Sequence, residues 1–253
     1  MSVSVNFSAP GVAEIIINRD EKRNALNTET VNGIVDCAVA LAAESTLRVV
    51  ILRSVGDRAF SAGADIGELA ALDQSTAYGF INNLRRAIQA VFDLPVPVIC
   101  RIHGACIGGA MELAAACDLR IASEKASFCM PEVRVGIPSV IQAALLPRIM
   151  GRGRAGWLVL SGDVIDAKTA FDWGFIEKLV SAENLDRAVD EAVCSILASA
   201  PGAVRTQKRL LKDWDELPLD QAITASMDAF AESYKSDEPE TYMAHIKAKK
   251  SKA

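Results

Sequence analysis

The sequence has little histidine, no long apolar run and no excess of basic residues. Its 253 residues include two histidines, His103 and His245, and neither stands at ligand spacing from a cysteine, which argues against a zinc site. No segment reaches the roughly 18 uninterrupted apolar residues of a membrane-spanning helix. The net charge of −5 argues against a nucleic-acid partner, because phosphate binding needs concentrated Lys and Arg. We therefore expect no metal site, no membrane span and no nucleic-acid partner.

The first residues of the chain and its cysteines indicate the cellular compartment in which the protein is expected. Residues 1–6 carry neither the basic and apolar blocks of a signal peptide nor the Arg-rich bias of a transit peptide. No CxxC spacing occurs among the six cysteines, and most of them have apolar neighbours. The cysteines are Cys37, Cys100, Cys106, Cys117, Cys129 and Cys194. We predict reduced thiols, mostly in the core, in a cytoplasmic protein.

Short β-branched runs in the first half predict strands. They span Val12–Ile17, Arg48–Arg53 and Leu94–Ile102, and none alternates with polar residues, as is typical of strands covered on both faces. Longer helical patterns lie between them, at Thr28–Glu44 and Gln74–Phe92, and Thr28 resembles a helix N-cap.

The second half is mainly helical from about residue 139. The predicted helices are Ala167–Trp173, Ala182–Ala198, Ala203–Trp214 and Leu219–Tyr234. Strands followed by helices indicate an α+β fold. We predict one folded unit, residues 1–195, followed by a C-terminal helical region, residues 196–253.

Two glycine-containing segments differ from ordinary core sequence. In Ala59–Ile66, small residues permit close approach of the backbone, and Gly63 tolerates positive φ. In His103–Ala114, Gly108 and Gly109 follow a predicted strand and open a helix, whose first amides lack internal partners. The second segment is not a nucleotide P-loop, since no GK[ST] follows it and the GxGxxG spacing is absent. Taken alone, the first segment could simply be a tight turn between a strand and a helix.

Two glutamates stand in apolar surroundings close after these turns. Glu112 follows Gly109 by three residues, so it lies about one helical turn in, on roughly the same face. Glu132 follows Pro131, which bars a regular helix through it. Poorly solvated carboxyls have raised pKa values suited to proton transfer. The alternatives are a Glu112 paired with Arg120 and a Glu132 that caps a helix, and spacing alone does not bring the two together.

At these residues the sequence resembles the crotonase family, the enoyl-CoA hydratase/isomerase superfamily. Asn18–Leu26 is similar to its early coenzyme A segment, and Phe60–Ile66 and Ile107–Ala114 to its two oxyanion turns. Phe128–Glu132 matches its second acid–base position. The similarity continues in order through Leu160–Asp163 and Ala170–Phe175. The resemblance implies ββα spiral repeats with a C-terminal helical trimerisation region, assembled as a trimer or a dimer of trimers.

The resemblance also implies an activity: reversible addition of water to a 2-enoyl-CoA thioester. Backbone amides of Ala64 and Gly109 would bind the thioester oxygen. Glu112 would help activate the water, and Glu132 would mainly handle the proton at C2. No cofactor is implied, because coenzyme A is part of the substrate. Residues implied to contact the acyl-CoA are Lys22, Arg23, Ala62, Asp65, Ile66 and Ser139, the first two at its phosphates and Ser139 through a backbone amide near the water.

Departures from the family pattern leave alternatives open. The segment 133–142 is shorter and bulkier than the glycine-rich segment of the family's hydratases, so the acyl group is undetermined. An isomerase, a decarboxylase, a retro-aldol enzyme and a non-catalytic acyl-CoA-binding subunit are the competing hypotheses. His103 is expected to be a structural turn residue.

Overall fold

The computed structural model describes residues 1–250, except for the side chains of residues 245, 246 and 248–250. His245 therefore lies outside the side chains that are described. Among the helices of residues 1–250, none is long and apolar enough to cross a membrane.

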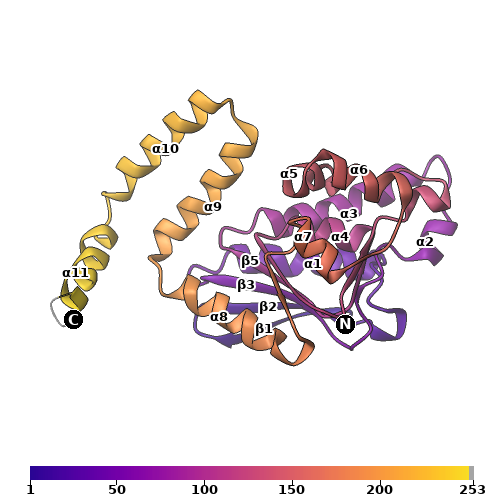
Figure 1. The fold of residues 1–253 in the computed structure, drawn as a ribbon, viewed down its shortest axis with the longest axis horizontal. Helices are drawn as coiled ribbons and strands as arrows, with labels where there is room; N and C mark the ends of the chain where they lie inside the picture. Colours follow the sequence, from indigo (N-terminus) through magenta and orange to yellow (C-terminus); the bar gives the residue numbers. More distant parts are fainter. Residues whose placement is uncertain (251–253) are drawn as a thin grey trace.

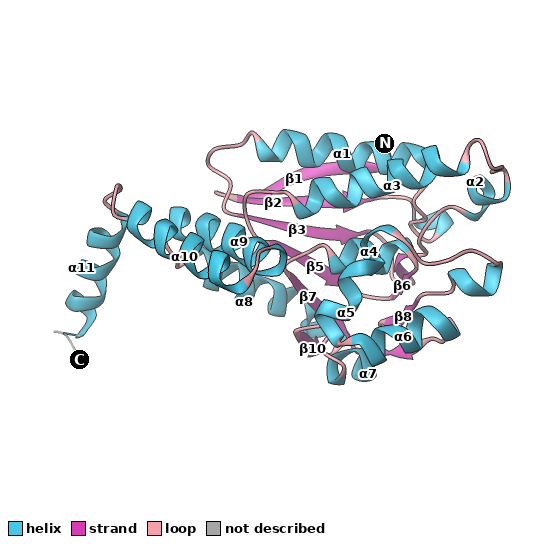
Figure 2. Cartoon of the chain, turned by 90° about the horizontal axis from the view of Figure 1, so that it is seen from above, coloured by secondary structure: helices cyan, strands magenta, loops and turns pink. Residues whose placement is uncertain are grey.

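The larger of two sheets has six strands in the order β1-β2-β3-β5-β7-β10. Its strands are β1 (Val3–Ala9), β2 (Val12–Ile17), β3 (Val49–Ser54), β5 (Val98–Ile102), β7 (Leu119–Ser123) and β10 (Lys178–Val180). All neighbours are parallel except the β1–β2 hairpin. The carboxyl ends of the parallel strands therefore share one edge, which is visible in Figure 2.

A smaller, four-stranded sheet lies beyond that edge, with the strand order β4-β6-β8-β9. Its strands are β4 (Ala59–Ser61), β6 (Ala105–Ile107), β8 (Ser127–Cys129) and β9 (Ile165–Asp166). Strands β4, β6 and β8 follow β3, β5 and β7 in the chain and pair in parallel with one another. A long strand, a short strand and a helix thus recur, as the predicted ββα repeats require.

Helices cover both faces of the larger sheet (Figures 1 and 2). Helices α1 (Thr28–Ala42), α3 (Ala77–Phe92) and α4 (Gly109–Ala115) pack on one face, and α8 (Leu185–Leu197) packs on the other. In β3 the two faces alternate, because Val50 and Leu52 contact the first group and Val49 and Ile51 the second.

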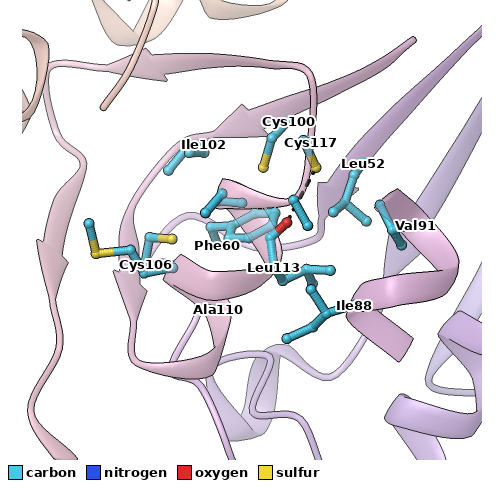
Figure 3. Close-up of a cluster of buried hydrophobic side chains, with 14 of the residues drawn as sticks. Leu52, Phe60, Ile88, Val91, Cys100, Ile102, Cys106, Ala110, Leu113 and Cys117 are labelled. Carbon is cyan, nitrogen blue, oxygen red and sulfur yellow. Dashed lines mark hydrogen bonds between the residues drawn. The ribbon is translucent and has the colours of Figure 1, made fainter. Parts of the chain in front are cut away.

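Helix α4 is buried along its whole length. Figure 3 shows Leu113 of α4 among Phe60, Ile88 and Val91, and the Cys117 thiol donates a hydrogen bond to the Leu113 carbonyl at 3.4 Å. Four of the six cysteines are buried, as predicted, whereas Cys194 is exposed. Because every residue of α4 is enclosed, side chains on it are held in fixed positions.

The remaining helices are short segments around the core and a C-terminal group. The short ones are α2 (Ile66–Ala70), α5 (Leu146–Met150), α6 (Arg152–Ser161), α7 (Ala167–Asp172) and the 3-10 helices η1 (Asp20–Lys22), η2 (Glu132–Val135), η3 (Ile141–Leu145) and η4 (Ala182–Asn184). The C-terminal helices α9 (Pro201–Glu216), α10 (Leu219–Ser233) and α11 (Glu238–Lys250) extend away from the core (Figure 1).

The predicted fold class is confirmed, and two local expectations need correction. The N-cap of α1 is Asn27, not Thr28: the Asn27 side chain accepts a hydrogen bond from the Thr30 amide at 3.0 Å. Helix α3 begins at Ala77 instead of Gln74, because the Asp73 carboxylate accepts from the Ser75 and Thr76 amides and holds that segment in a turn. The division at residue 195 stays a prediction.

Candidate active site

Two turns meet where β4 and β6 end. Gly63 follows β4 with φ +81°, and a Cβ placed there would overlap the carbonyl oxygen of Ile107, the last residue of β6. From the other side, a Cβ on Gly109 would lie 3.8 Å from the Ala64 amide nitrogen. Parallel pairing of β4 with β6 carries both turns to one edge. Glycine at position 63 is therefore required by both φ and space.

The amides of Ala64 and Gly109 are available at this junction. The neighbouring amides are used, since Ala62 donates to the Arg23 carbonyl, Asp65 to that of Leu26 and Gly108 to that of Cys129. Within the described part of the chain, neither the Ala64 nor the Gly109 amide donates a hydrogen bond to another group. Two free donors on touching turns can together bind an oxygen that carries negative charge.

Glu112 lies on α4, one turn after Gly109, and is 3% exposed. Burial, and in second place the charge of Glu132, raise its pKa from the ordinary 4.5 to about 8. The backbone amides of Ala143 and Val140 face the carboxyl and oppose part of this shift. Its Oε2 atom is buried and has no partner among the described residues. Burial therefore favours the protonated form of Glu112 near neutral pH.

The alternative of a Glu112 paired with Arg120 is wrong. The guanidinium of Arg120 donates to the carbonyls of Phe175 and Cys117 and forms an ion pair with Glu177. These contacts hold the guanidinium at the C-terminal end of α4, whereas Gly109 lies at its N-terminal end.

Glu132 opens η2 directly after Pro131, and its carboxylate lies against the second glycine turn. A Cβ on Gly108 would be 2.5 Å from Glu132 Oε1. The Ser139 hydroxyl donates to the other oxygen, Oε2, at 2.8 Å. Glu132 is thus brought to the start of the helix that carries Glu112, and its charge raises the Glu112 pKa. The two carboxyls, 20 positions apart in sequence, share one site with the two free amides.

Comparison with known proteins places the chain in a family. The enoyl-CoA hydratase/isomerase family profile matches residues 8–251. The chain belongs to this family. It is 34% identical to the crotonyl-CoA hydratase of Syntrophomonas wolfei, over 87% of this chain and 85% of that protein. It is 31% identical to the short-chain-enoyl-CoA hydratase of Clostridium acetobutylicum, over 92% and 89%.

A solved member of the enoyl-CoA hydratase/isomerase family has the same fold throughout. The crystal structure of an enoyl-CoA hydratase from Bacillus anthracis superposes with a TM-score of 0.94 at 30% identity. The superposition covers 98% of this chain and 97% of that one. The family resemblance inferred from the sequence is confirmed.

The other residues that the sequence predicts to contact the acyl-CoA lie around the first glycine turn. Lys22 and Arg23 are exposed in the segment that leads to Leu26, which pairs with Ala64. Ile66 is 80% exposed, and Ala62 is tied to Arg23 through its amide. These placements are compatible with a ligand along this surface, and their contact with one stays a prediction.

The Asp65 side chain already has structural partners. It forms a 2.6 Å ion pair with Arg19 and accepts hydrogen bonds from the Gly67 and Glu68 amides at the start of α2. These bonds lower the pKa of Asp65, with the Arg19 hydrogen bond the largest cause. Asp65 thus fixes the first turn, and a direct contact between its carboxylate and a substrate remains untested.

Two residues that hold this turn were not singled out from the sequence. Asn24 is fully buried, with φ +55°, and its side-chain amide donates to the carbonyls of Val55 and Ala59. Arg19 binds both Asp65 and the Ala25 carbonyl. Both lie in the segment that resembles the family's coenzyme A segment, but only long-range contacts reveal their bonds.

The raised pKa of Glu112 predicts a pH-dependent stability. Between pH 4.5 and about 8 the folded protein keeps a proton on Glu112 that the unfolded chain releases, so wild-type stability falls as pH rises through this window. Glu112→Gln removes this contribution, with a slope up to about 1.4 kcal/mol per pH unit. Urea unfolding at several pH values across this window should show that the free energy of unfolding of the variant increases relative to that of wild type as pH rises. Parallel stability profiles would contradict a neutral Glu112.

Proposed function

We propose that the protein is an enoyl-CoA hydratase, which reversibly adds water across the C2=C3 bond of a 2-enoyl-CoA thioester to give a 3-hydroxyacyl-CoA. One observation carries the proposal: two carboxyls, Glu112 and Glu132, meet beside the free amides of Ala64 and Gly109. Relatives named crotonyl-CoA hydratase and short-chain-enoyl-CoA hydratase agree with the hydro-lyase predicted from the sequence.

The amides of Ala64 and Gly109 would polarise the substrate. Both would donate to the thioester carbonyl oxygen, which gains negative charge as water attacks C3 and an enolate forms. Because the glycine turns fix these donors before substrate arrives, no reorganisation is needed when the charge develops. Polarisation of the carbonyl makes C3 electrophilic through the conjugated double bond.

The carboxyl pair would handle the water and the proton. Two close carboxyls share one proton, because both cannot ionise at low cost. One can therefore accept a proton from the water while the other donates one to C2. In the sequence-based hypothesis, Glu112 helps activate the water and Glu132 mainly handles the proton at C2. This assignment of roles is open to test. The reaction uses no electron transfer, and members of this family generally need no cofactor besides the coenzyme A of the substrate.

Coenzyme A would lie over the surface formed by the first turn. Lys22 and Arg23 are exposed there and offer positive charge to its phosphates. Ala62 and Ile66 would border the acyl-CoA next to the Ala64 amide. A cytoplasmic location, as expected from the sequence, is part of the same proposal.

Crotonyl-CoA tests the proposal directly. Glu112→Gln and Glu132→Gln should each lower kcat by about 10²–10⁴-fold, because each removes a proton-transfer group. The loss of the conjugated enoyl absorbance reports the rate. Glu191→Gln serves as the control, since this exposed carboxylate on α8 pairs with Lys178, away from the site.

A wild-type protein as inert as the Glu112→Gln, Glu132→Gln double variant would contradict a short-chain hydratase. A 3-enoyl-CoA substrate separates the nearest alternative: a 2-enoyl product would indicate an isomerase. Stabilisation by acyl-CoA without turnover would indicate a non-catalytic binding subunit.

The C-terminal helices would assemble the enzyme as a trimer or a dimer of trimers. Along one face of α10, spaced at helical intervals, large apolar side chains lie 53–78% exposed: Leu219, Ile223, Met227 and Phe230. Such a stripe is costly in water and is typical of a contact surface.

A charge on the α10 face should break that assembly. The double variant Met227→Glu, Phe230→Glu would place two carboxylates in the contact and should give monomers in size-exclusion chromatography with light scattering. Glu232→Gln, a change at an exposed residue of α10 outside the stripe, should leave the wild-type size unchanged. A monomeric wild type would refute this part of the proposal.

A further inference from the structure

A short strained turn lies beside Glu112. Ile141, the first residue of η3, has φ +43°, a costly conformation for a β-branched side chain. On its two sides, the backbone amides of Val140 and Ala143 face the Glu112 carboxyl. Strain of this kind persists only where surrounding contacts hold the backbone in place. The position of the two amides therefore depends on the contacts that η3 makes.

Gln142 ties this turn to helix α3. It is the one polar residue of η3, whose other side chains are all apolar. Its amide nitrogen, Nε2, donates to Gln89 Oε1 on α3 at 3.2 Å, and both side chains are partly buried. Within the described chain, no other side chain of residues 140–145 makes a hydrogen bond. Because α3 packs on the core of the larger sheet, this bond joins the turn to a fixed element.

Asp93, at the C-terminal end of α3, sets the direction of this contact. Gln89 Nε2 donates to Asp93 Oδ2 at 3.0 Å. Since a carboxylate only accepts, the Gln89 amide group turns its nitrogen to Asp93 and its oxygen to Gln142, which must then present its own nitrogen. Lys212 of α9 pairs with the other Asp93 oxygen at 2.8 Å. The chain of bonds thus begins on a C-terminal helix and ends at the turn.

The side-chain oxygen of Gln142 shows that packing alone does not explain this residue. Oε1 is buried and accepts no hydrogen bond from any of the described residues. A buried acceptor without a donor destabilises a fold, whereas an apolar side chain of similar size would not. Packing would therefore favour leucine at this position. What glutamine adds is the bond to Gln89, and local choices that lower stability are typical of functional sites.

We infer that Asp93, Gln89 and Gln142 form a relay of hydrogen bonds that positions the strained turn of η3 and the two backbone amides at the active site. Gln89 and Gln142 are positioning residues, because they act through the backbone of η3. Through Lys212, the relay connects helix α9 with the active site. The consequence for turnover rests on the proposed function, whereas the effect on the turn does not.

Hydrogen–deuterium exchange of the purified full chain tests the relay without substrate. In Gln89→Leu and in Asp93→Ala, the backbone amides of residues 140–146 should exchange about two- to tenfold faster than in wild type, as expected for loss of one hydrogen bond. Asp172→Ala is the matched control, since this carboxylate at the end of α7 is 52% exposed against 49% for Asp93 and also pairs with a lysine. Unchanged exchange in Gln89→Leu would overturn the inference, whether or not the protein is a hydratase.

Kinetics with crotonyl-CoA test the link to turnover. Gln89→Leu should lower kcat by about two- to tenfold with KM nearly unchanged. The double variant Gln89→Leu, Gln142→Leu should lower kcat no further, because the single change already breaks the relay. Its free energy of unfolding should equal or exceed that of wild type, since both partners of the bond become apolar. A double variant with wild-type kcat, or one with a raised KM and unchanged kcat, would overturn the positioning role. Asp172→Ala should keep wild-type kcat.

Discussion

The close contact between two glycine turns determines the geometry of this site. Gly63 has no room for a side chain, because the Ile107 carbonyl occupies that space, and its φ of +81° suits glycine. The contact sets the Ala64 amide beside Gly109 and fixes the start of α4. Since Glu112 is one helical turn further along, its position follows from the same contact. The smaller sheet supplies this arrangement, because β4 and β6 pair in parallel and end together.

Burial then determines the acid–base properties of Glu112. Enclosure of α4 on all sides raises the pKa of Glu112 to about 8, within reach of physiological pH, whereas Glu132 keeps partial contact with solvent and a hydroxyl partner. Two carboxyls in unlike environments can act as acid and base at the same pH. Among the described residues no cation pairs with Glu112, and Arg120 is instead paired with Glu177.

Much of the fold followed from local sequence, and most of the site did not. Strands β2, β3 and β5 are continuous β-branched runs, so their prediction was confirmed. The three-residue strands β4, β6 and β8 have no such signal, because their pairing depends on contacts across the chain. Physical reasoning identified the glycines and both glutamates as unusual, and only the family resemblance linked them. The Ser139–Glu132 bond could not be predicted, since it joins side chains seven positions apart, and residues 136–138 between them form no helix or strand.

The central claim is that the contact of the two turns creates the catalytic site, and Gly63→Ala tests it most directly. The added methyl would collide with the Ile107 carbonyl and displace the Ala64 amide. We predict that kcat with crotonyl-CoA falls by about 10²-fold or more, as when one oxyanion donor is lost. Gly153→Ala on α6, where a Cβ meets no atom within 4 Å, should leave kcat unchanged. A folded Gly63→Ala protein with wild-type kcat would contradict the account.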